Sequence, residues 1–414
     1  SGGGFSMGSL HIRNDHAASS TILVTGGSLS LSDVRIDSGS PEVGAIVLRG
    51  GRAQIDGSTI ATSGGAPLLR ADGGELSVTD STLVGGTTPS EESLVVLSGG
   101  ASADLLHTKL ESGSALRIAA VRADHATLSI EGGELSSGIA TASAVGLLSQ
   151  SSSVSLKDTA IRSSSDSRLT FGIQAVGSKL TVDGVTIDAR GQVGATGVYA
   201  DNSTVSINAA TIRGAQTSEF LYLVKLVGSQ AALTNSLLTG ARSGDFLAVG
   251  LTRSTGYVVD NTLFGGEGRD RLAALLLESS PGVNVADNIF ARVPTSAAGQ
   301  QPGVAILVRA STFVGAILSN DFSGYAAVYE DGAGKRADVG ALDRSDGNEK
   351  GGSFAGNVTE APIATFAAAG DFHLTPGSLC RGSGVDPARF GAPATDIEGT
   401  KRSGRFDIGA YFGR

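Results

Sequence analysis

The sequence predicts an all-β protein: a single-stranded parallel β-helix of about 12 coils of roughly 25 residues, closed by a C-terminal capping segment. Three observations lead to this prediction. A nine-residue unit recurs along most of the chain, a short apolar stretch precedes most copies, and turn-forming residues separate the two. The 60 glycines among 414 residues also argue against a helical protein, because glycine costs about 1 kcal/mol in a helix interior.

The recurring unit has one spacing of apolar and turn-forming residues, as in KLTVDGVTI (residues 179–187). Its fourth residue is always aliphatic, and its ninth is always Ile, Leu or Phe. Its sixth is Asp, Asn or Gly in nine of eleven copies, with His107 and Ala209 as the exceptions. The copies cover residues 28–36, 52–60, 75–83, 102–110, 127–135, 153–161, 179–187, 204–212, 230–238, 256–264 and 282–290. A looser twelfth copy ends at Phe322.

Each repeat reads as three short strands and three turns, which is one coil of a parallel β-helix. Side chains alternate faces along a strand, so the second and fourth residues of the unit both point toward the core. The sixth residue tolerates the left-handed backbone that turns the chain, and the ninth points inward from the next strand. In KLTVDGVTI, Asp183-Gly184 is therefore a turn rather than a catalytic loop. Stacking of the coils makes the core continuous.

Two sets of side chains are expected to stack from coil to coil in the C-terminal half. The first is a ladder of hydrogen-bonded amides at or beside the turn, formed by Asn235, Asn261, Asn288 and Asn320. The second is an aromatic column in the core, formed by Phe264, Phe290, Phe313 and Phe322. Tyr257 is also expected at an inward position of its repeat.

Charge and composition exclude several classes of function. The formal net charge of −9 argues against a nucleic-acid partner, which would need a basic face. No run of 18 apolar residues is present, so no transmembrane segment is predicted. The single cysteine, Cys380, cannot form an internal disulfide and is expected to be a small buried residue. The first coil begins at residues 10–13 without a cap. We therefore expect native residues before Ser1, and an open N-terminal end that could pair two molecules.

The C-terminal residues leave the repeat and carry three motifs: DFHLTPGSLC (371–380), DIEGTKR (396–402) and DIGAY (407–411). In this order they resemble the closing segment of bacterial right-handed parallel β-helix proteins of the pectin-lyase-like superfamily. These include exported surface proteins of the choice-of-anchor and polymorphic outer-membrane repeat kinds. The resemblance implies a right-handed helix, with coils over residues 1–352 and a capping segment, residues 353–414, in the same domain. Asp371, His373, Arg402 and Asp407 are interpreted as hydrogen-bonded residues of this segment.

The resemblance also raises the possibility of an enzyme, because many proteins of the superfamily cleave acidic polysaccharides. Lyase chemistry needs a base near the sugar C5 and a cation that neutralises the uronate, whereas hydrolysis needs paired carboxylates. The polar insertions 265–272 and 330–352 hold the candidate catalytic residues: Arg269, Asp270, Asp331, Lys335, Arg336, Asp338, Asp343 and Arg344. Weak Ca²⁺ candidates are Asp343, Asp346 and Glu349.

Aromatic content argues against sugar processing. The chain has no Trp and six Tyr, and those available to stack on a sugar ring are Tyr199, Tyr222, Tyr257, Tyr325 and Tyr329. The preferred interpretation is therefore a non-catalytic, exported β-helix of a bacterial cell-surface or envelope protein, extracellular or outer-membrane-associated. It would act as a spacer, an adhesin or a recognition surface. The expected partner is a cell-surface protein or polysaccharide. No cofactor is expected, with Ca²⁺ as an alternative.

The alternative function is a polysaccharide lyase or glycoside hydrolase acting on an acidic polysaccharide. The surface should separate the two. Smooth faces of Ser and Thr favour the scaffold. A groove in which Lys or Arg and carboxylates converge beside an exposed Tyr favours the enzyme.

Overall fold

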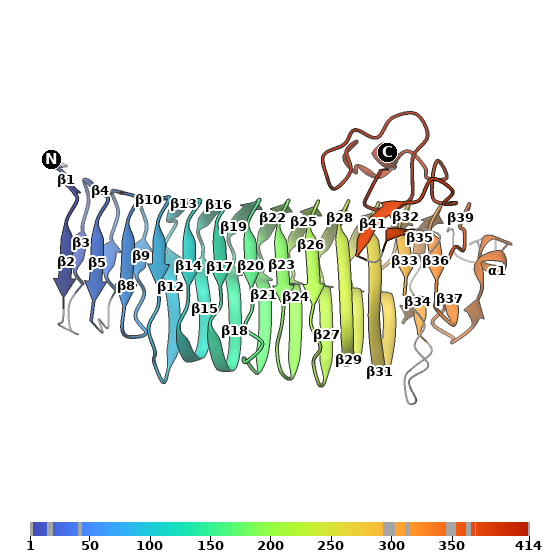
Figure 1. Ribbon diagram of the computed structural model, residues 1–414, viewed down its shortest axis with the longest axis horizontal. Helices are drawn as coiled ribbons and strands as arrows, with labels where there is room; N and C mark the ends of the chain where they lie inside the picture. The colour runs from blue at the N-terminus through green and yellow to red at the C-terminus, as the bar shows by residue number, and fades with distance from the viewer. Residues whose placement is uncertain are drawn as a thin grey trace. The chain divides into compact units, whose positions relative to one another are not determined.

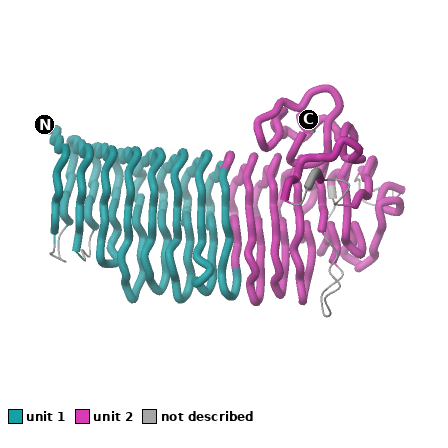
Figure 2. The backbone as a smooth tube through the Cα atoms, viewed as in Figure 1, with its two compact units in different colours: residues 1–181, 185–194 teal, residues 182–184, 195–414 magenta. Residues whose placement is uncertain are grey.

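The computed structural model describes residues 3–14, 20–39, 44–292, 303–310, 314–344, 353–361, 366–368 and 370–412. The chain is nearly all-β and forms a parallel β-solenoid of about 12 turns of roughly 26 residues (Figure 1). This confirms the predicted fold class, whereas the right-handedness stays a prediction. The chain divides into two compact units, residues 1–181 with 185–194 and residues 182–184 with 195–414 (Figure 2). The two units are described one at a time.

In unit 1, three sets of strands each pair in parallel with the equivalent strand of the next coil. The first set is β1 (Gly4–Gly8), β4 (Ser28–Ser32), β7 (Arg52–Asp56), β10 (Glu75–Thr79), β13 (Ser102–Leu106), β16 (Thr127–Glu131) and β19 (Ser153–Lys157). The second is β2 (His11–Asn14), β5 (Arg35–Ser38), β8 (Thr59–Thr62), β11 (Thr82–Val84), β14 (Lys109–Glu111), β17 (Glu134–Ser136), β20 (Ala160–Arg162) and β23 (Thr186–Ala189). The third is β3 (Ile22–Val24), β6 (Ile46–Leu48), β9 (Leu69–Asp72), β12 (Glu91–Ser98), β15 (Ser114–Asp124), β18 (Ile139–Gln150) and β21 (Leu169–Val176). Strand β22 (Lys179–Asp183) contributes residues to both units.

Unit 2 continues the same order of strands. The strands of the first set are β25 (Thr204–Asn208), β28 (Gln230–Thr234), β30 (Thr255–Val259), β32 (Val283–Ala286), β35 (Val314–Leu318) and β39 (Ser353–Ala355). The other solenoid strands are β24 (Gly194–Asp201), β26 (Thr211–Gly214), β27 (Phe220–Val227), β29 (Leu237–Thr252), β31 (Thr262–Glu278), β33 (Ile289–Ala291), β34 (Val304–Arg309), β36 (Asp321–Ser323) and β37 (Ala327–Glu330). The remaining elements are β38 (Arg336–Ala337), α1 (Val339–Arg344), β40 (Phe366–Ala368), β41 (Asp371–Leu374) and the 3₁₀ helix η1 (Pro387–Phe390).

The left-handed turn predicted at the sixth position of the repeat is present. Positive φ angles occur at Asp33, Gly57, Asp80, His107, Gly132, Asp158, Gly184, Ala209, Asn235 and Asp287. His107 and Ala209, the two exceptions in composition, both have φ of 49°. The backbone therefore keeps the turn even where the side chain does not favour it, because the coils above and below impose it.

The predicted copy of the repeat at 256–264 is displaced by one residue, because in the structure Thr255 and Leu263 occupy the first and ninth positions of this copy. Val258, not Val259, pairs with Leu233, and Asp260 takes the left-handed turn with φ of 59°. The prediction of an inward Tyr257 is therefore wrong: Tyr257 pairs with Ala232, and its hydroxyl donates to the Gly391 carbonyl at 3.4 Å. Two adjacent valines fit the apolar position equally well, so the pattern alone could not choose between them.

The aromatic column is confirmed in part. Phe290 and Phe322 are fully buried and stack with ring centroids 5.2 Å apart. Phe264 lies outside the column because of the one-residue shift, and makes edge contacts with Phe366 and Phe372 instead. Phe313 lies outside the described residues.

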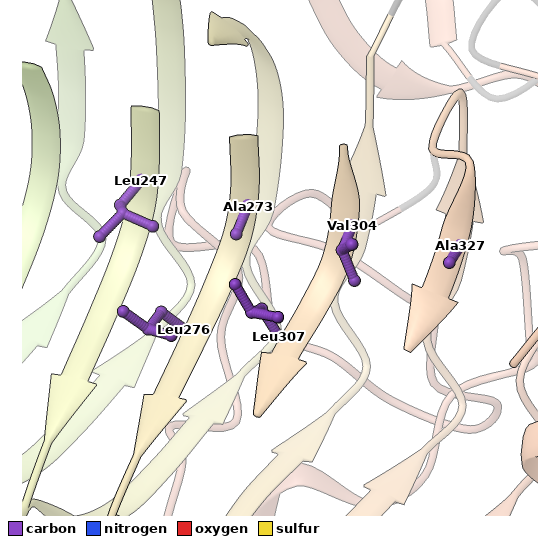
Figure 3. Packing of buried hydrophobic residues seen from close by; sticks show 6 residues of the cluster. All are labelled: Leu247, Ala273, Leu276, Val304, Leu307 and Ala327. Carbon is purple, nitrogen blue, oxygen red and sulfur yellow. The ribbon is translucent and has the colours of Figure 1, made fainter. Parts of the chain in front are cut away.

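Unit 2 also holds a separate apolar cluster that links four coils. It consists of Leu247, Ala273, Leu276, Val304, Leu307 and Ala327, on β29, β31, β34 and β37 (Figure 3). Leu247, Ala273, Val304 and Ala327 follow one another in strand register. Small and branched side chains at equivalent positions thus stack directly from coil to coil.

The asparagine ladder is confirmed for Asn261, Asn288 and Asn320, is wrong for Asn235, and extends beyond Asn320. The backbone N and the Nδ2 of Asn261 both donate to Oδ1 of Asn288 at 3.0 Å, and Asn288 donates to Asn320 in the same way. Asn320 donates to Asn357, which donates to the carboxylate of Asp343 on α1. Asn235 is not part of the ladder, since Ser236 takes the equivalent place and donates its N–H to Asn261. Asp343 ends the ladder as a group that only accepts.

Replacement of Asn288 by Ala should lower the free energy of unfolding by about 3 kcal/mol or more, because several buried donors and acceptors lose partners at once. Urea denaturation followed by circular dichroism measures this change. Asn284→Ala, on β32 beside it but partly exposed, is the control and should cost under about 1 kcal/mol. Equal losses in the two variants would contradict a stabilising role for the ladder.

Candidate functional site

The first predicted catalytic pair, Arg269 and Asp270, lies exposed on β31. Nε and Nη2 of Arg269 donate to the neighbouring Asp270 carboxylate at 3.1 and 2.8 Å. Both side chains are more than half exposed. The pair holds itself in place and has no other hydrogen-bond or ion-pair partner in the described part of the chain.

Most candidates in the second insertion form hydrogen bonds with residues close to them in sequence. Asp331 accepts the backbone N–H groups of Ala333 and Lys335 and closes a turn. Arg336 donates to Glu330 at 2.7 Å, and Asp338 accepts the N–H of Ala341 in the first turn of α1. Asp343 ends the asparagine ladder, and the side chains of Lys335 and Arg344 are exposed.

These candidates do not converge on one site. Within the described residues, no hydrogen bond or ion pair joins Arg269 or Asp270 to the six other candidate catalytic residues, which lie between Asp331 and Arg344. Asp346 and Glu349, two of the Ca²⁺ candidates, lie outside the described residues. The described part of the chain contains no group of three or more His, Cys, Asp or Glu side chains placed to hold a metal ion. It also contains no helix long and apolar enough to cross a membrane.

A polar cluster that the sequence did not single out lies on β27, β29 and β31. The Tyr222 hydroxyl donates to Asp245 at 2.7 Å, and Arg271 donates to the same carboxylate through Nε at 2.7 Å and through Nη2. Asp245 and Arg271 pair in register on neighbouring strands. Lys225 places its Nζ 4.5 Å from the centre of the Tyr222 ring, and Phe220 stacks on the same ring.

The electrostatics of this cluster are perturbed by partial burial. Burial lowers the pKa of Lys225, and the Arg271 guanidinium lowers it further. Burial and the hydrogen bond to Asp245 raise the pKa of Tyr222 to about 12. A lysine whose charge is disfavoured beside a tyrosine and an arginine is an arrangement found at catalytic sites and also in structural ion-pair networks.

Sequence reasoning missed this cluster because its members fall outside the nine-residue unit. Tyr222 and Lys225 are the two polar residues that interrupt the apolar stretch FLYLVKLV of β27. Asp245 and Arg271 become partners only through the register of β29 and β31, which have bulges and different lengths. The available signal was the interruption of an apolar strand by Tyr and Lys.

A hollow of about 350 Å³ opens on the same strands, lined by Gln216, Gly240, Ala241, Arg242, Phe264, Gly265, Gly266 and Glu267. Phe264 forms an aromatic wall, and the exposed Arg242 guanidinium has no hydrogen-bond or ion-pair partner among the described residues. The glycines have a packing reason: a Cβ at Gly240 or Gly266 would lie 2.2 Å from the Phe246 ring. A side chain at either position would therefore collide with the buried Phe246 ring, which requires glycine in this part of the lining.

The surface of unit 1 has a different character. The third residues of successive strands of the first set lie in register and face outward: Ser30, Gln54, Ser77, Asp104, Ser129 and Ser155. All are short or polar and at least partly exposed. This row corresponds to the smooth polar face expected of a scaffold.

The C-terminal residues interpreted as hydrogen-bonded are so. His373 contacts Asp371 through Nδ1 at 2.6 Å, which raises the pKa of the histidine. Arg402 is fully buried and donates to the Gly409 carbonyl at 2.7 Å, and Asp407 accepts the Gly382 N–H at 2.6 Å. Cys380 is buried, as predicted, and burial raises the pKa of its thiol.

No protein-family model matches the chain, and a search of curated proteins finds no match. The protein is therefore classified by its fold, a parallel β-solenoid, and not by a family.

The ammonium of Lys225 should titrate below the ordinary lysine range, because burial and Arg271 both disfavour its charge. Carbon-13 NMR of reductively methylated protein measures this pKa, with Lys225→Gln identifying the signal. In Arg271→Met the same pKa should rise, since one repelling charge is lost and Asp245 no longer has a guanidinium that neutralises its charge near the lysine. A Lys225 signal that is unchanged in Arg271→Met would contradict the coupling.

Proposed function

We propose that this chain is a non-catalytic β-solenoid scaffold of an exported bacterial cell-surface or envelope protein, and that it presents a recognition surface on unit 2. The observation that carries the proposal is the state of the predicted catalytic residues. Each one described either has its charged group engaged in a local contact or lies exposed without a converging partner. The row of outward-facing polar side chains on unit 1 supports the same function, since it fits a well-hydrated scaffold face. The export and the surface location rest on the resemblance of the C-terminal motifs.

The hollow at Phe264 is the recognition site that the geometry favours. Its volume lies within the range of small-molecule sites, and it combines an aromatic wall with a few polar groups. The unpaired Arg242 suits a carboxylate, because a guanidinium binds that group in a two-pronged geometry. A sugar ring that carries a carboxylate could therefore contact Phe264 with its apolar face and Arg242 with its charge.

Binding of oligogalacturonate and of a neutral oligosaccharide of equal length tests this site by calorimetry. The acidic sugar should bind more tightly, and Phe264→Ala and Arg242→Ala should each weaken its binding about tenfold. Arg168→Ala, which removes an exposed arginine from unit 1, is the matched control and should bind as the unchanged protein does. Equal affinity for the two sugars, or equal effects of Arg242→Ala and Arg168→Ala, would contradict the proposal.

A second candidate, a polysaccharide lyase, is favoured by the cluster at Tyr222. Lys225 would be the base that removes the C5 proton of a uronate, because its lowered pKa leaves more of it neutral. The cluster as it stands is internally paired, with Asp245 bound to both Tyr222 and Arg271. We rank it second for that reason.

Incubation with a panel of uronate polymers separates the two candidates, with ultraviolet absorbance reporting the unsaturated product of a lyase. The scaffold proposal expects no product above buffer. Product formation that Lys225→Ala abolishes and Arg168→Ala leaves intact would establish the lyase and overturn the scaffold.

A further inference from the structure

The C-terminal residues 378–412, called the tail segment below, lie against three successive turns of unit 2. These turns have Asn235, Asp260 and Asp287 at the left-handed position, with φ of 48°, 59° and 55°. Equivalent residues of neighbouring coils stand about 5 Å apart. The tail segment therefore covers a stack of one amide and two carboxyl groups, all buried.

The contacts between the tail segment and this stack are few and specific. Arg402 donates through Nη2 to Asn235 Oδ1 at 3.2 Å, and its Nη1 lies 3.5 Å from Asp260 Oδ1. The Val385 N–H donates to Asp287 Oδ1 at 2.9 Å, and the Gly409 N–H donates to the Asp287 carbonyl at 2.7 Å. Apolar contacts add to these, since Ile408 packs with Ile289 and Ala392 with Val259 and Ala286.

The charges in this interface do not balance when both carboxyl groups are ionised. The charged groups that face Asp287 are Asp260 on the neighbouring coil and Arg402 and Arg389 on the tail segment, and Asp260 faces Arg402. Arg402 is the one fully buried cation among them, whereas Arg389 is exposed, so that solvent screens its charge. Neither oxygen of Asp260, nor Oδ2 of Asp287, has a hydrogen-bond partner in the described part of the chain. Two buried carboxylates beside one buried guanidinium would leave an uncompensated charge, which is strongly unfavourable.

We propose that the tail segment is a proton-linked latch, closed when Asp287 carries a proton and loosened when that carboxyl group ionises beside Asp260. Burial also raises the pKa of Asp260, to about 7, but Arg402 opposes that shift, so Asp287 is the carboxyl group that keeps its proton to the higher pH. Closing the tail segment thus binds a proton at Asp287, joined below about pH 7 by one at Asp260, and a rise in pH favours the open state.

The direction and the pH range of this effect follow from the difference between the pKa of Asp287 in the closed state and in the open state. Burial and the nearby Asp260 raise the pKa of Asp287 from its ordinary value of 3.8 to about 8 in the closed state. The stabilising effect of the proton is complete below the pKa of the exposed carboxyl group and is lost as the pH rises toward 8. A one-proton step changes the opening equilibrium by at most about tenfold per pH unit over this range.

A further buried carboxyl group, Asp321, lies near the tail segment, and its titration must be distinguished from that of Asp287. Asp321 accepts the Glu360 N–H at 2.8 Å, and burial raises the pKa of its carboxyl group to about 7. Glu360 and the Cys380 thiol are the titratable groups that face it. A variant at Asp321 is therefore part of the test.

Cys380 provides the readout, because it is the one cysteine of the chain and is fully buried in the tail segment. The rate at which a thiol reagent modifies Cys380, divided by the rate in the denatured protein at the same pH, gives the protection of the closed state. We expect this protection to fall from pH 5.5 to 8, by up to about tenfold per pH unit above pH 7, and to level off above pH 8. Hydrogen exchange of a peptide covering residues 382–391, which includes the Val385 amide, should follow the same course.

Asp287→Asn is the decisive variant. Asn keeps the Oδ1 acceptor for Val385 and suits the left-handed turn, as Asn235 shows at the equivalent position. It should abolish the pH dependence above pH 7, where Asp287 is the group that titrates, and protect Cys380 more than the unchanged protein at pH 8. Asp158→Asn, the same change at the same turn position on an exposed coil of unit 1, is the matched control and should leave the protection unaltered.

Arg402→Met tests the charge balance independently. It should reduce the protection of Cys380 far more at pH 8 than at pH 5.5, because protonation at the lower pH removes the charges that lose their partner. Protection that does not vary with pH in the unchanged protein would overturn the proposal. So would a pH dependence between pH 7 and 8 that survives Asp287→Asn, or one that Asp321→Asn removes in its place.

Discussion

Parallel pairing of each strand with the equivalent strand of the next coil is the constraint on which the rest of the structure depends. This pairing fixes one register, and a fixed register puts the same position of every coil in one row. Core leucines, left-handed turns, serines and asparagines all occur in rows for that reason. The rows then supply side-chain hydrogen bonds that run between coils, so that the turns are held as firmly as the strands.

The polar cluster at Asp245 and the hollow at Phe264 both lie where the strands of unit 2 depart from the regular rows. Strands β29 and β31 continue through a turn that other coils make with separate strands, and their bulges bring Asp245 beside Arg271. The hollow at Phe264 is lined by glycines of the same strands, and Gly240 and Gly266 pack against the buried Phe246 ring. Irregular geometry, rather than a special motif, thus creates the surface on which recognition is proposed. The lyase alternative depends on the neighbouring strand β27, where Lys225 is partly buried and its pKa is lowered by burial and by Arg271.

The fold was predictable from the sequence because its information is local and repeated. Residues such as Val182 and Gly184 recur at fixed offsets, and each copy supports the others. The prediction was wrong at 256–264, where Val258 and Val259 are both apolar and the coil length changes by one residue. The candidate site was not predictable in the same way. Asp245 and Arg271 are 26 positions apart and meet only through strand pairing. The partners of Arg269 and Asp343, which are Asp270 and Asn357, belong to no sequence motif that would predict these contacts.

The asparagine ladder has a direction, and this has a consequence for how such a chain can change length. Every asparagine of the ladder donates its backbone N–H to the side chain that follows and accepts, through Oδ1, from the asparagine or serine that precedes, until Asp343 accepts without donating. The Nδ2 group donates in both directions, since it also bonds a backbone carbonyl of the preceding coil. An additional coil with asparagine at this position would consume one acceptor and supply one. Duplication or loss of a coil between Asn261 and Asn357 would therefore leave the hydrogen bonding of the ladder complete. A coil added beyond Asp343 would not, so gene duplication in this unit is expected to be tolerated within the ladder and selected against at its end.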